Sequence, residues 1–266
     1  MDLGLEGKVA LVSGGSKGIG REIARLLAAE GVRVAVVARG GDVLRETVSE
    51  LAASGAEAMP VVADMTAADD ISRAVAETRD AFGDVDIAMS NVYPLHKATL
   101  DVTSDEDFVQ EFESMVLSVV RLARAVVPAM RRRRFGRLVN IGSVTMKGPT
   151  FGFPMLLSNV MRPAVVGLDK ALSHELGADG ITVNNIAVGS IKTERARDSY
   201  QRRTQQAATS FEELERARVA ELAIPLQRMG DPSDVAALAT FLASPLAGYI
   251  TGQTIPVDGG RTGGLF

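Results

Sequence analysis

The sequence predicts an α/β fold in which helices cover both faces of a doubly wound parallel sheet. Short β-branched runs alternate with longer helical patterns along most of the chain. These runs are apolar throughout, which is typical of strands buried on both faces. A glycine-rich segment joins the first run to the first helical pattern, as in nucleotide-binding α/β folds. With 266 residues, 46% of them hydrophobic, the chain suits a single domain spanning residues 1–266.

About seven strands are expected, most of them separated by a helical pattern. They cover residues 8–14, 32–38, 56–64, 85–91, 136–143, 181–189 and 253–260. Residues 19–31 predict an amphipathic helix that Gly31 closes. Right-handed crossovers between such strands produce the doubly wound, Rossmann-type arrangement.

Residues 194–223 depart from this rhythm with a long polar helical pattern after the sixth strand. An excursion beyond the carboxyl end of a strand commonly forms a lid over a substrate. The same pattern also fits an ordinary solvated helix, and the sequence does not separate the two interpretations.

Composition argues against several functions. The net charge of -4 disfavours nucleic acid as a partner, because phosphate contacts need a basic face. The chain has no cysteine, which excludes thiolate chemistry, and its two histidines, His96 and His174, argue against a protein-built metal site. The basic cluster Arg131–Arg134 follows an apolar helical pattern, so we interpret it as cations at a helix C-terminus.

No signal for secretion or membrane insertion is found. The N-terminal residues lack a basic segment followed by a long apolar one, and no apolar run approaches the roughly 20 residues of a membrane span. We therefore expect a soluble cytoplasmic protein.

The segment SGGSKGIG, residues 13–20, predicts a dinucleotide site because it lies between a predicted strand and a predicted helix. Glycines let the backbone approach a pyrophosphate, and the helix N-terminus supplies amides and positive potential. The cofactor-binding residues expected in this loop are Gly14, Ser16, Lys17, Gly18, Ile19 and Gly20.

The spacing Gly-x-x-x-Gly-x-Gly resembles that of the short-chain dehydrogenase/reductase family, and the resemblance covers nearly the whole chain. GRLVNIGS matches the family's fifth strand and its catalytic serine, here Ser143. GITVNNIAVGSIKT matches the sixth strand and the nicotinamide-side loop, with Val188 in place of the usual proline. GYITGQTIPVDGG is close to the family's C-terminal signature. The further cofactor contacts that the resemblance implies are Asp64, Met65, Asn91 and Thr193.

The end of the second strand favours NADP over NAD. An NAD site would place a carboxylate there to bind the ribose, but the sequence has Ala38 and then Arg39. Lys17 adds a second cation in the glycine loop. Two cations and no acid suit a 2′-phosphate, although both side chains would also be compatible with simple exposure to water.

The family's catalytic Tyr and the Lys four residues later are absent. Aligned back from the sixth strand, their positions fall on Ser158 and Arg162; aligned forward from Ser143, they fall on Leu156 and Val160. Neither register restores the pair. An aliphatic hydroxyl is a much weaker acid than a phenol, and an arginine stays charged.

Two further features separate this chain from the usual family pattern. The position of the relay asparagine holds Met115, and Pro163 is expected to bias Arg162 away from helical geometry. The motif SVTMKGP followed by LLSNVMR nevertheless resembles a divergent, oxoacyl-carrier-protein reductase-like subgroup, in which Lys147 is the lysine after the serine. Arg162 could still hold ribose hydroxyls or a phosphate.

Other residues are candidates for the missing acid. Tyr93 and His96 follow the fourth strand, at the edge where the nicotinamide is expected, and Lys147 follows Ser143. The expected catalytic set is therefore Ser143, Ser158, Arg162, Lys147, Tyr93 and His96, with no metal.

The resemblance implies an oxidoreductase that uses NADP(H) on a carbonyl, alcohol or enone, with a non-standard proton source, and a homo-oligomer, either a tetramer or a dimer. Phe151, Phe153 and Met155 suggest an apolar small-molecule substrate, although they also suit a core. Two alternatives stay open. One is a lyase, cyclase or isomerase with the same fold, and the other is a catalytically inactive nucleotide-binding protein.

Overall fold

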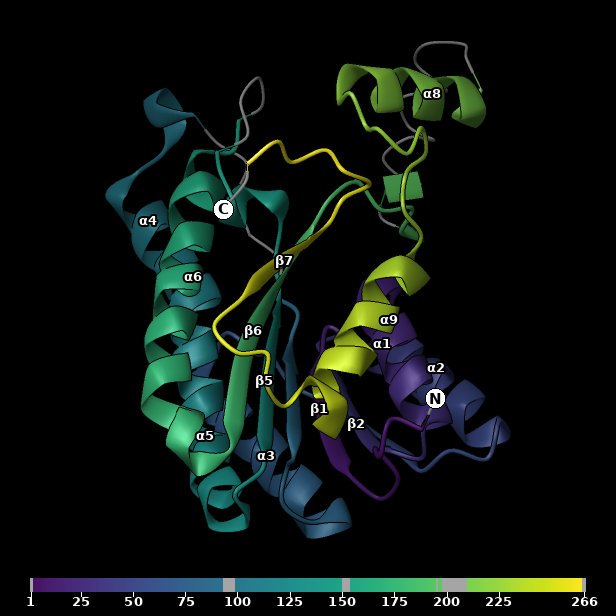
Figure 1. Cartoon of the computed structure of the whole chain (residues 1–266), viewed down its shortest axis with the longest axis vertical. Coiled ribbons are helices and arrows are strands. Elements are labelled where there is room, and N and C mark those ends of the chain that lie inside the picture. Colours follow the sequence, from purple (N-terminus) through teal and green to yellow (C-terminus); the bar gives the residue numbers. More distant parts are fainter. Residues whose placement is uncertain (1, 93–98, 150–153, 195, 198–209, 265–266) are drawn as a thin grey trace.

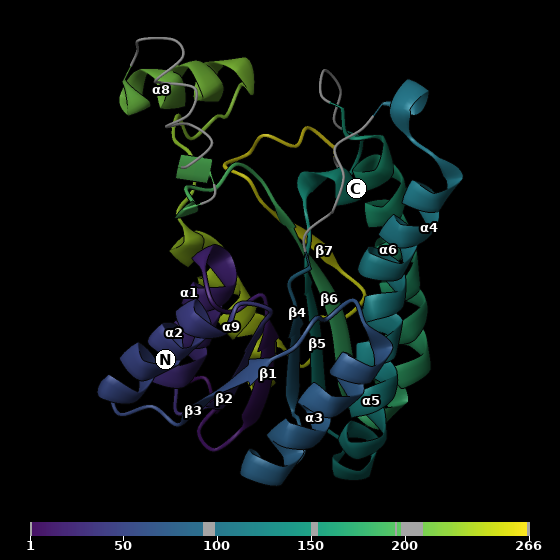
Figure 2. The same cartoon turned by 180° about the vertical axis from the view of Figure 1, so that it is seen from behind.

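One sheet of seven parallel strands forms the centre of the protein (Figures 1 and 2). The computed structural model describes residues 2–92, 99–149, 154–194, 196–197 and 210–264. The strands are β1 (Val9–Ser13), β2 (Arg33–Ala38), β3 (Ala58–Val62), β4 (Ile87–Ser90), β5 (Gly136–Ile141), β6 (Ile181–Val188) and β7 (Thr254–Val257). Each lies within or overlaps a predicted strand, so the predicted doubly wound sheet is confirmed.

The strand order β3-β2-β1-β4-β5-β6-β7 creates a switch point between β1 and β4. The chain runs outward from β1 to β3, returns to pair β4 with β1, and then runs outward in the other direction. Loops leaving β1 and β4 diverge at their carboxyl ends, and the crevice at such a point is where doubly wound folds bind ligands.

Two layers of helices sandwich the sheet (Figures 1 and 2). One face carries α1 (Gly18–Ala29), α2 (Gly41–Ala53) and α9 (Pro232–Ala243). The other carries α3 (Ala68–Phe82), α5 (Ser118–Arg133) and α6 (Leu156–Leu176). The remaining elements are α4 (Asp105–Phe112), a π-helical turn (Glu113–Leu117), α8 (Phe211–Glu221) and the 3-10 turns Leu100–Val102, Val144–Met146, Gly177–Asp179 and Pro245–Ala247.

Helix α1 shows why these sequences fold as they do. Its apolar residues Ile23, Ala24 and Leu27 recur at helical spacing and are completely buried against the sheet. The helix ends at Ala29, and Gly31 then adopts a φ of 76°, a left-handed conformation that favours glycine. Gly31 therefore closes the helix as predicted.

The basic cluster Arg131–Arg134 lies at the C-terminus of α5, which confirms its interpretation as helix-terminal cations. Arg131 pairs with Asp179 at 2.8 Å and Arg132 with Asp84 at 3.2 Å. These arginines tie α5 to the loops beside it.

Helix α8 occupies part of the predicted lid segment and lies beyond the N-terminal end of α9 in Figure 1. A capping box at Ser210 begins it, and Val219 packs with Ile224 and Met229 in a small apolar cluster. Residues 195 and 198–209 of the predicted lid lie outside the described residues. No helix in the described part of the chain is both long enough and apolar enough to span a bilayer.

Candidate nucleotide and catalytic site

The glycine loop is built so closely that side chains are excluded at its key positions. Gly14 has a φ of 61°, and a Cβ added there would lie 2.6 Å from the Asn91 carbonyl oxygen. A Cβ on Gly20 would lie 2.2 Å from the Gly14 carbonyl oxygen, inside van der Waals contact with backbone. The backbone of this turn is thus compact and accessible, as close approach to a pyrophosphate requires.

The N-terminus of α1 begins in this loop, and the Glu194 carboxylate lies beside its first residue, Gly18. Its N-cap residue is Lys17, whose extended backbone precedes Gly18, and no side chain caps the helix. The first turn contains no acidic residue. The amides of the first turn, including those of Ile19 and Gly20, therefore present donors and positive potential to an anion.

Neighbouring segments hold the loop in place. The Ser13 hydroxyl accepts a hydrogen bond from the Asn91 amide at 2.8 Å, which joins the ends of β1 and β4. The Thr47 hydroxyl of α2 donates to the Ser16 carbonyl at 3.0 Å. Thr193, after β6, lies against the loop, because a Cβ on Gly18 would be 3.3 Å from its methyl group.

Asp64 and Met65 follow β3 at the same edge of the sheet. Asp64 is half-buried, and its Oδ1 accepts hydrogen bonds from the Thr66 amide at 3.0 Å and the Thr66 hydroxyl at 2.8 Å. Its own amide donates to Asp70 at 2.7 Å, which is the main reason why the pKa of Asp70 lies below its ordinary value. These bonds fix the Asp64 carboxylate at the end of β3.

Arg39 and Lys17 are both exposed at this edge, Arg39 after β2 and Lys17 in the glycine loop. Gly40 and Gly41 follow Arg39 and begin α2, and a Cβ on Gly40 would meet nothing within 4 Å. The nearest acid along this chain segment, Asp42, pairs with Arg45 at 2.5 Å. Two cations thus stand at the place where the sequence predicts a 2′-phosphate.

Burial distinguishes the residues of the two alignment registers in the catalytic segment. On α6, Ser158 is 2% exposed and Arg162 is 7% exposed, whereas Val160 is 45% exposed and points away from the sheet. Ser158 and Arg162 lie four residues apart and share the face that packs on the strands. The structure thus brings Ser158 and Arg162 together on the buried face of α6, and their match to the family's Tyr and Lys stays a prediction.

Arg162 is helical, which shows that the predicted effect of Pro163 was wrong. Helix α6 continues through both residues, and Pro163 lies on its exposed face. A proline inside a helix forfeits one backbone hydrogen bond but does not end the helix when neighbouring packing holds it. The Arg162 guanidinium donates to the Ile141 carbonyl at 3.2 Å and to the Val92 carbonyl at 3.2 Å. It thus joins the carboxyl ends of β5 and β4 from below the site.

A short row of hydroxyl groups connects Ser143 to Ser158. Ser143 caps the turn Val144–Met146 by accepting from the Thr145 amide at 3.5 Å. The Thr145 hydroxyl lies 3.5 Å from the Ser158 hydroxyl, and Thr145 is completely buried. Thr145 is not among the predicted site residues, because a threonine near a serine carries no distinctive signal until α6 lies beside it.

Lys147 ends the same turn and is half-buried, with its amide donating to the Val144 carbonyl at 2.9 Å. The turn therefore keeps the Lys147 backbone close to Ser143. Tyr93, His96, Phe151 and Phe153 lie outside the described residues.

Met115 fills the relay position with apolar volume. It lies in the π-helical turn and is 3% exposed. It packs with Met146 and Met161, on the elements that carry Ser143 and Ser158. A π-turn within an α-helix often marks a functional site, but here it presents thioether and methyl groups to the site rather than an amide.

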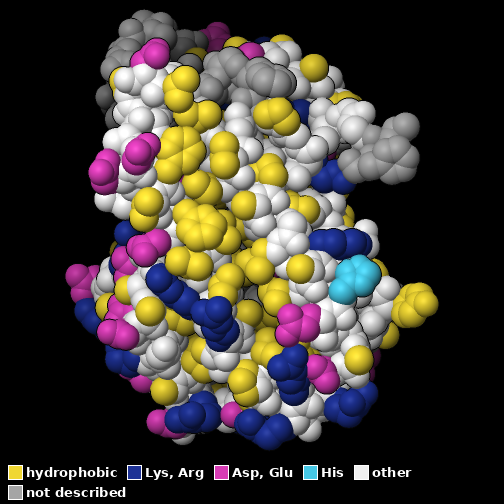
Figure 3. All heavy atoms as spheres, turned by 90° about the vertical axis from the view of Figure 1, so that its left-hand side faces the viewer, with side chains coloured by type: hydrophobic (Ala, Val, Ile, Leu, Met, Phe, Trp, Pro, Cys, Tyr) yellow, Lys and Arg dark blue, Asp and Glu magenta, His cyan; other side chains and the backbone are white. Residues whose placement is uncertain are grey.

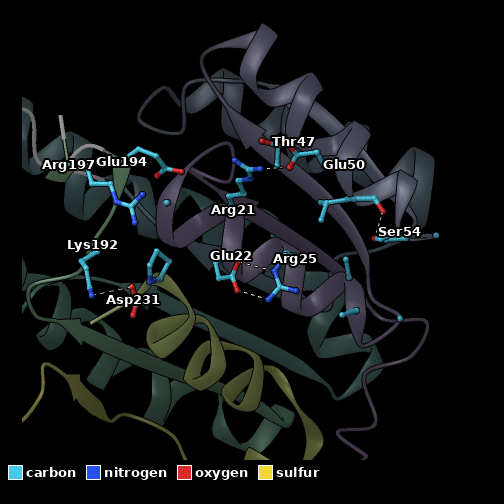
Figure 4. Close-up of a pocket in the computed structure, with 18 residues that line it drawn as sticks. Arg21, Glu22, Arg25, Thr47, Glu50, Ser54, Lys192, Glu194, Arg197 and Asp231 are labelled. Carbon is cyan, nitrogen blue, oxygen red and sulfur yellow. Dashed lines mark hydrogen bonds and ion pairs between the residues drawn. The ribbon is translucent and has the colours of Figure 1, made fainter. Parts of the chain in front are cut away.

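A separate groove of about 820 Å³ runs between α1, α2 and the loop around Lys192, with Gly18 at its edge (Figure 4). Its charges are largely paired, since Arg21 contacts Glu50, Arg25 lies 2.6 Å from Glu22 and Lys192 lies 3.9 Å from Asp231. We expect the nucleotide instead at the N-terminus of α1, where no side chain caps the helix and the first amides have no acceptor within it.

A doubly wound sheet with a glycine loop at the N-terminus of its first helix defines a dinucleotide-binding protein of oxidoreductase type. A family model described as enoyl-(acyl carrier protein) reductase matches residues 14–262. The chain belongs to the short-chain dehydrogenase/reductase family.

Two curated relatives share about a third of the sequence. The 3-oxoacyl-[acyl-carrier-protein] reductase FabG of Vibrio cholerae is 34% identical over 259 residues, covering 97% of this chain and 98% of the relative. The enzyme of the same name from Escherichia coli is 34% identical over 258 residues, with the same coverage.

Two solved structures are similar over almost the whole fold. L-sorbose reductase from Gluconobacter frateurii, in complex with NADPH and L-sorbose, superposes with a TM-score of 0.94, 32% identity and full coverage of both chains. An NADPH-bound short-chain oxidoreductase from Pseudomonas aeruginosa, whose catalytic centre is described as atypical, has a TM-score of 0.88 and 29% identity over 97% of both chains.

Proposed function

We propose that this protein is an NADPH-dependent reductase of a small carbonyl compound or enone that protonates its product by a non-standard route. The observation that carries the proposal is the glycine cradle, in which a Cβ on Gly20 would lie 2.2 Å from backbone at the open N-terminus of α1. Such a cradle fits a dinucleotide pyrophosphate and few other ligands. The similarity to NADPH-bound reductases supports the same reading.

The choice of NADPH rests on charge at the end of β2. Arg39 and Lys17 are exposed where the 2′-phosphate would lie, and Arg39 can hold a phosphate with two parallel hydrogen bonds. Asp64, held by Thr66, is placed for the adenine amino group. Asn91 and Thr193 would border the ribose and nicotinamide portions.

The described residues have different roles in the proposed reaction. A bound dihydronicotinamide supplies hydride to the substrate. In this proposal Ser143 orients the substrate oxygen, and the ammonium of Lys147, four residues later, supplies the proton that this oxygen takes up. Ser158 is too deeply buried to reach a substrate, and an arginine such as Arg162 does not give up a proton near neutral pH.

Mixing the enzyme with NADPH and a panel of ketones, β-ketoacyl thioesters and enones tests this proposal. We expect loss of NADPH absorbance with at least one of them. Lys147→Ala should lower kcat by about 10²–10⁴-fold, whereas Lys147→Arg should keep binding and lose most of the proton-transfer rate. Equal turnover in the wild type and Lys147→Ala would remove Lys147 from this role.

A second candidate, nucleotide binding without redox turnover, is favoured by one observation. The relay position holds buried Met115, and the hydroxyl in the Tyr position, on Ser158, is buried as well. In that case calorimetry would detect NADPH binding while no substrate in the panel consumed it. A non-redox enzyme would instead form product without net NADPH consumption.

We further propose that the protein assembles as a homo-oligomer through the face of α4, α5 and α6. Apolar side chains extend over this face in Figure 3. Val109 is 60% exposed, Phe112 42% and Val160 45%, which is unusual for three large apolar residues on one side of a molecule. Light scattering gives the mass, and Phe112→Glu should dissociate the assembly.

A further inference from the structure

A carboxyl group, that of Asp169, is buried beneath the catalytic segment. Asp169 lies on α6 two turns after Arg162 and is 1% exposed. It continues the buried face of the helix that carries Ser158 and Arg162 nearer its N-terminus. An aspartate is rarely fully buried unless a partner or a proton compensates for the lost hydration.

The strands below Asp169 present a row of neutral polar side chains. Ser90, Asn140 and Asn185 are register neighbours on β4, β5 and β6, so they share one face of the sheet. Asn140 donates to Asp169 Oδ2 at 2.5 Å. No described cation faces the carboxyl, because the Lys170 side chain reaches outward to the Gly252 carbonyl.

Two oxygen atoms of this cluster have no donor at hydrogen-bond distance. Asp169 Oδ1 and Asn185 Oδ1 are both buried acceptors with no hydrogen-bond partner among the described residues. A proton on the carboxyl would supply the missing donor. A cavity of about 10 Å³ between Ser90, Asn140 and Asp169 also has room for about one water molecule. Such a water molecule could relay the hydrogen bond from the protonated carboxyl to the other acceptor.

Burial provides the energetic reason for such a proton. It raises the pKa of Asp169 from 3.8 to about 7, against the opposing hydrogen bonds of Asn140 and Asn185. The groups that line the cavity from α5 are Val119, Leu122 and Ala123, which cannot titrate. The carboxyl therefore changes charge near neutral pH without a neighbouring charge to offset it.

Asn140 links the protonation state of the Asp169 carboxyl to the proposed site. Asn140 precedes Ile141, whose carbonyl accepts from Arg162 at 3.2 Å. Helix α6 therefore contacts β5 twice, at a lower contact between Asp169 and Asn140 and at an upper contact between Arg162 and Ile141. An ionised, unpaired Asp169 would draw water in and loosen the lower contact. The upper contact, which positions Arg162 and Ser158 at the crevice, would then loosen with it.

We propose that Asp169 is a positioning residue that holds α6 against β4, β5 and β6 in its neutral form and releases it on ionisation, so that NADPH binding weakens as the pH rises. This inference rests on the proposed NADPH site. It concerns how the site is held together, whereas the proposed function concerns what the site binds.

NADPH titrations by calorimetry at about pH 6 and about pH 8 test the inference. If only the neutral form is competent, the apparent Kd of the wild type should rise about tenfold between these values, because the competent fraction falls tenfold around a pKa near 7. Asp169→Asn, which keeps the shape and cannot ionise, should remove this rise while binding as the wild type does at about pH 6. Asp179→Asn, which changes a half-buried carboxylate paired with Arg131 just after the same helix, is the matched control and should retain the rise.

The outcomes separate the two proposals. An equal rise in the wild type and Asp169→Asn overturns the positioning role of Asp169. No NADPH binding at either pH overturns the proposed function instead. In that case, or if Asp169→Asn fails to fold, urea unfolding of the wild type decides. A free energy of unfolding that does not fall between about pH 5 and about pH 8 overturns the inference.

Discussion

Replacing Arg162 by alanine should destabilise the protein by about 3 kcal/mol. The guanidinium donates to the carbonyls of Ile141 and Val92, each at 3.2 Å, and is 7% exposed. A hydrogen bond to a charged group contributes roughly 1.5–3 kcal/mol, so two bonds give about 3–6 kcal/mol. Because both carbonyls lie at the carboxyl ends of strands, water from the crevice can replace part of this loss, which favours the lower end.

Urea unfolding followed by circular dichroism measures this effect, since the free energy of unfolding falls linearly with urea. Arg162→Lys should lose about half as much, because one compact ammonium cannot span both carbonyls. Arg124→Ala, an exposed arginine on α5, should stay within about 0.5 kcal/mol of the wild type. A loss below about 1 kcal/mol for Arg162→Ala would show that the two hydrogen bonds of Arg162 do not hold the ends of β4 and β5. The guanidinium would then be available for a ligand.

Three further outcomes follow from the site and its surroundings. Arg39→Ala should weaken NADPH binding by roughly 10-fold or more and leave NADH binding nearly unchanged; equal losses in calorimetry would exclude a 2′-phosphate contact. Gly20→Ala should abolish nucleotide binding, since its Cβ would meet the Gly14 carbonyl at 2.2 Å, and normal NADPH affinity would contradict the cradle. Because burial raises the pKa of Asp169 to about 7 from 3.8, the free energy of unfolding should fall by at most about 4 kcal/mol as the pH rises from about 4 to about 7, and Asp169→Asn should flatten this slope in urea titrations.

The two residues that we predict at the positions of the family's catalytic pair pack against the scaffold. Ser158 and Arg162 face inward, and the three methionines at positions 115, 146 and 161 fill the space around them. In the function that we propose, proton delivery depends on the loops after β4 and β5. Such an arrangement would separate cofactor binding, which uses backbone and fixed charge, from proton transfer, which needs a titratable side chain in the right place.

The sequence by itself determined the sheet and the nucleotide loop. Both follow from local patterns, namely apolar runs of strand length and glycines between a strand and a helix, and local chain geometry dictates their outcome. It also predicts that the catalytic Tyr and Lys are missing, because neither alignment register restores them.

Only the tertiary structure decided how the catalytic segment packs. Packing of α6 on the strands buries Ser158 and Arg162, leaves Val160 exposed, and keeps the helix intact across Pro163. The same packing brought Asp169 over Asn140, 29 residues away in sequence. Side-chain burial and long-range hydrogen bonds depend on how distant segments meet, and no local pattern in the sequence encodes that meeting.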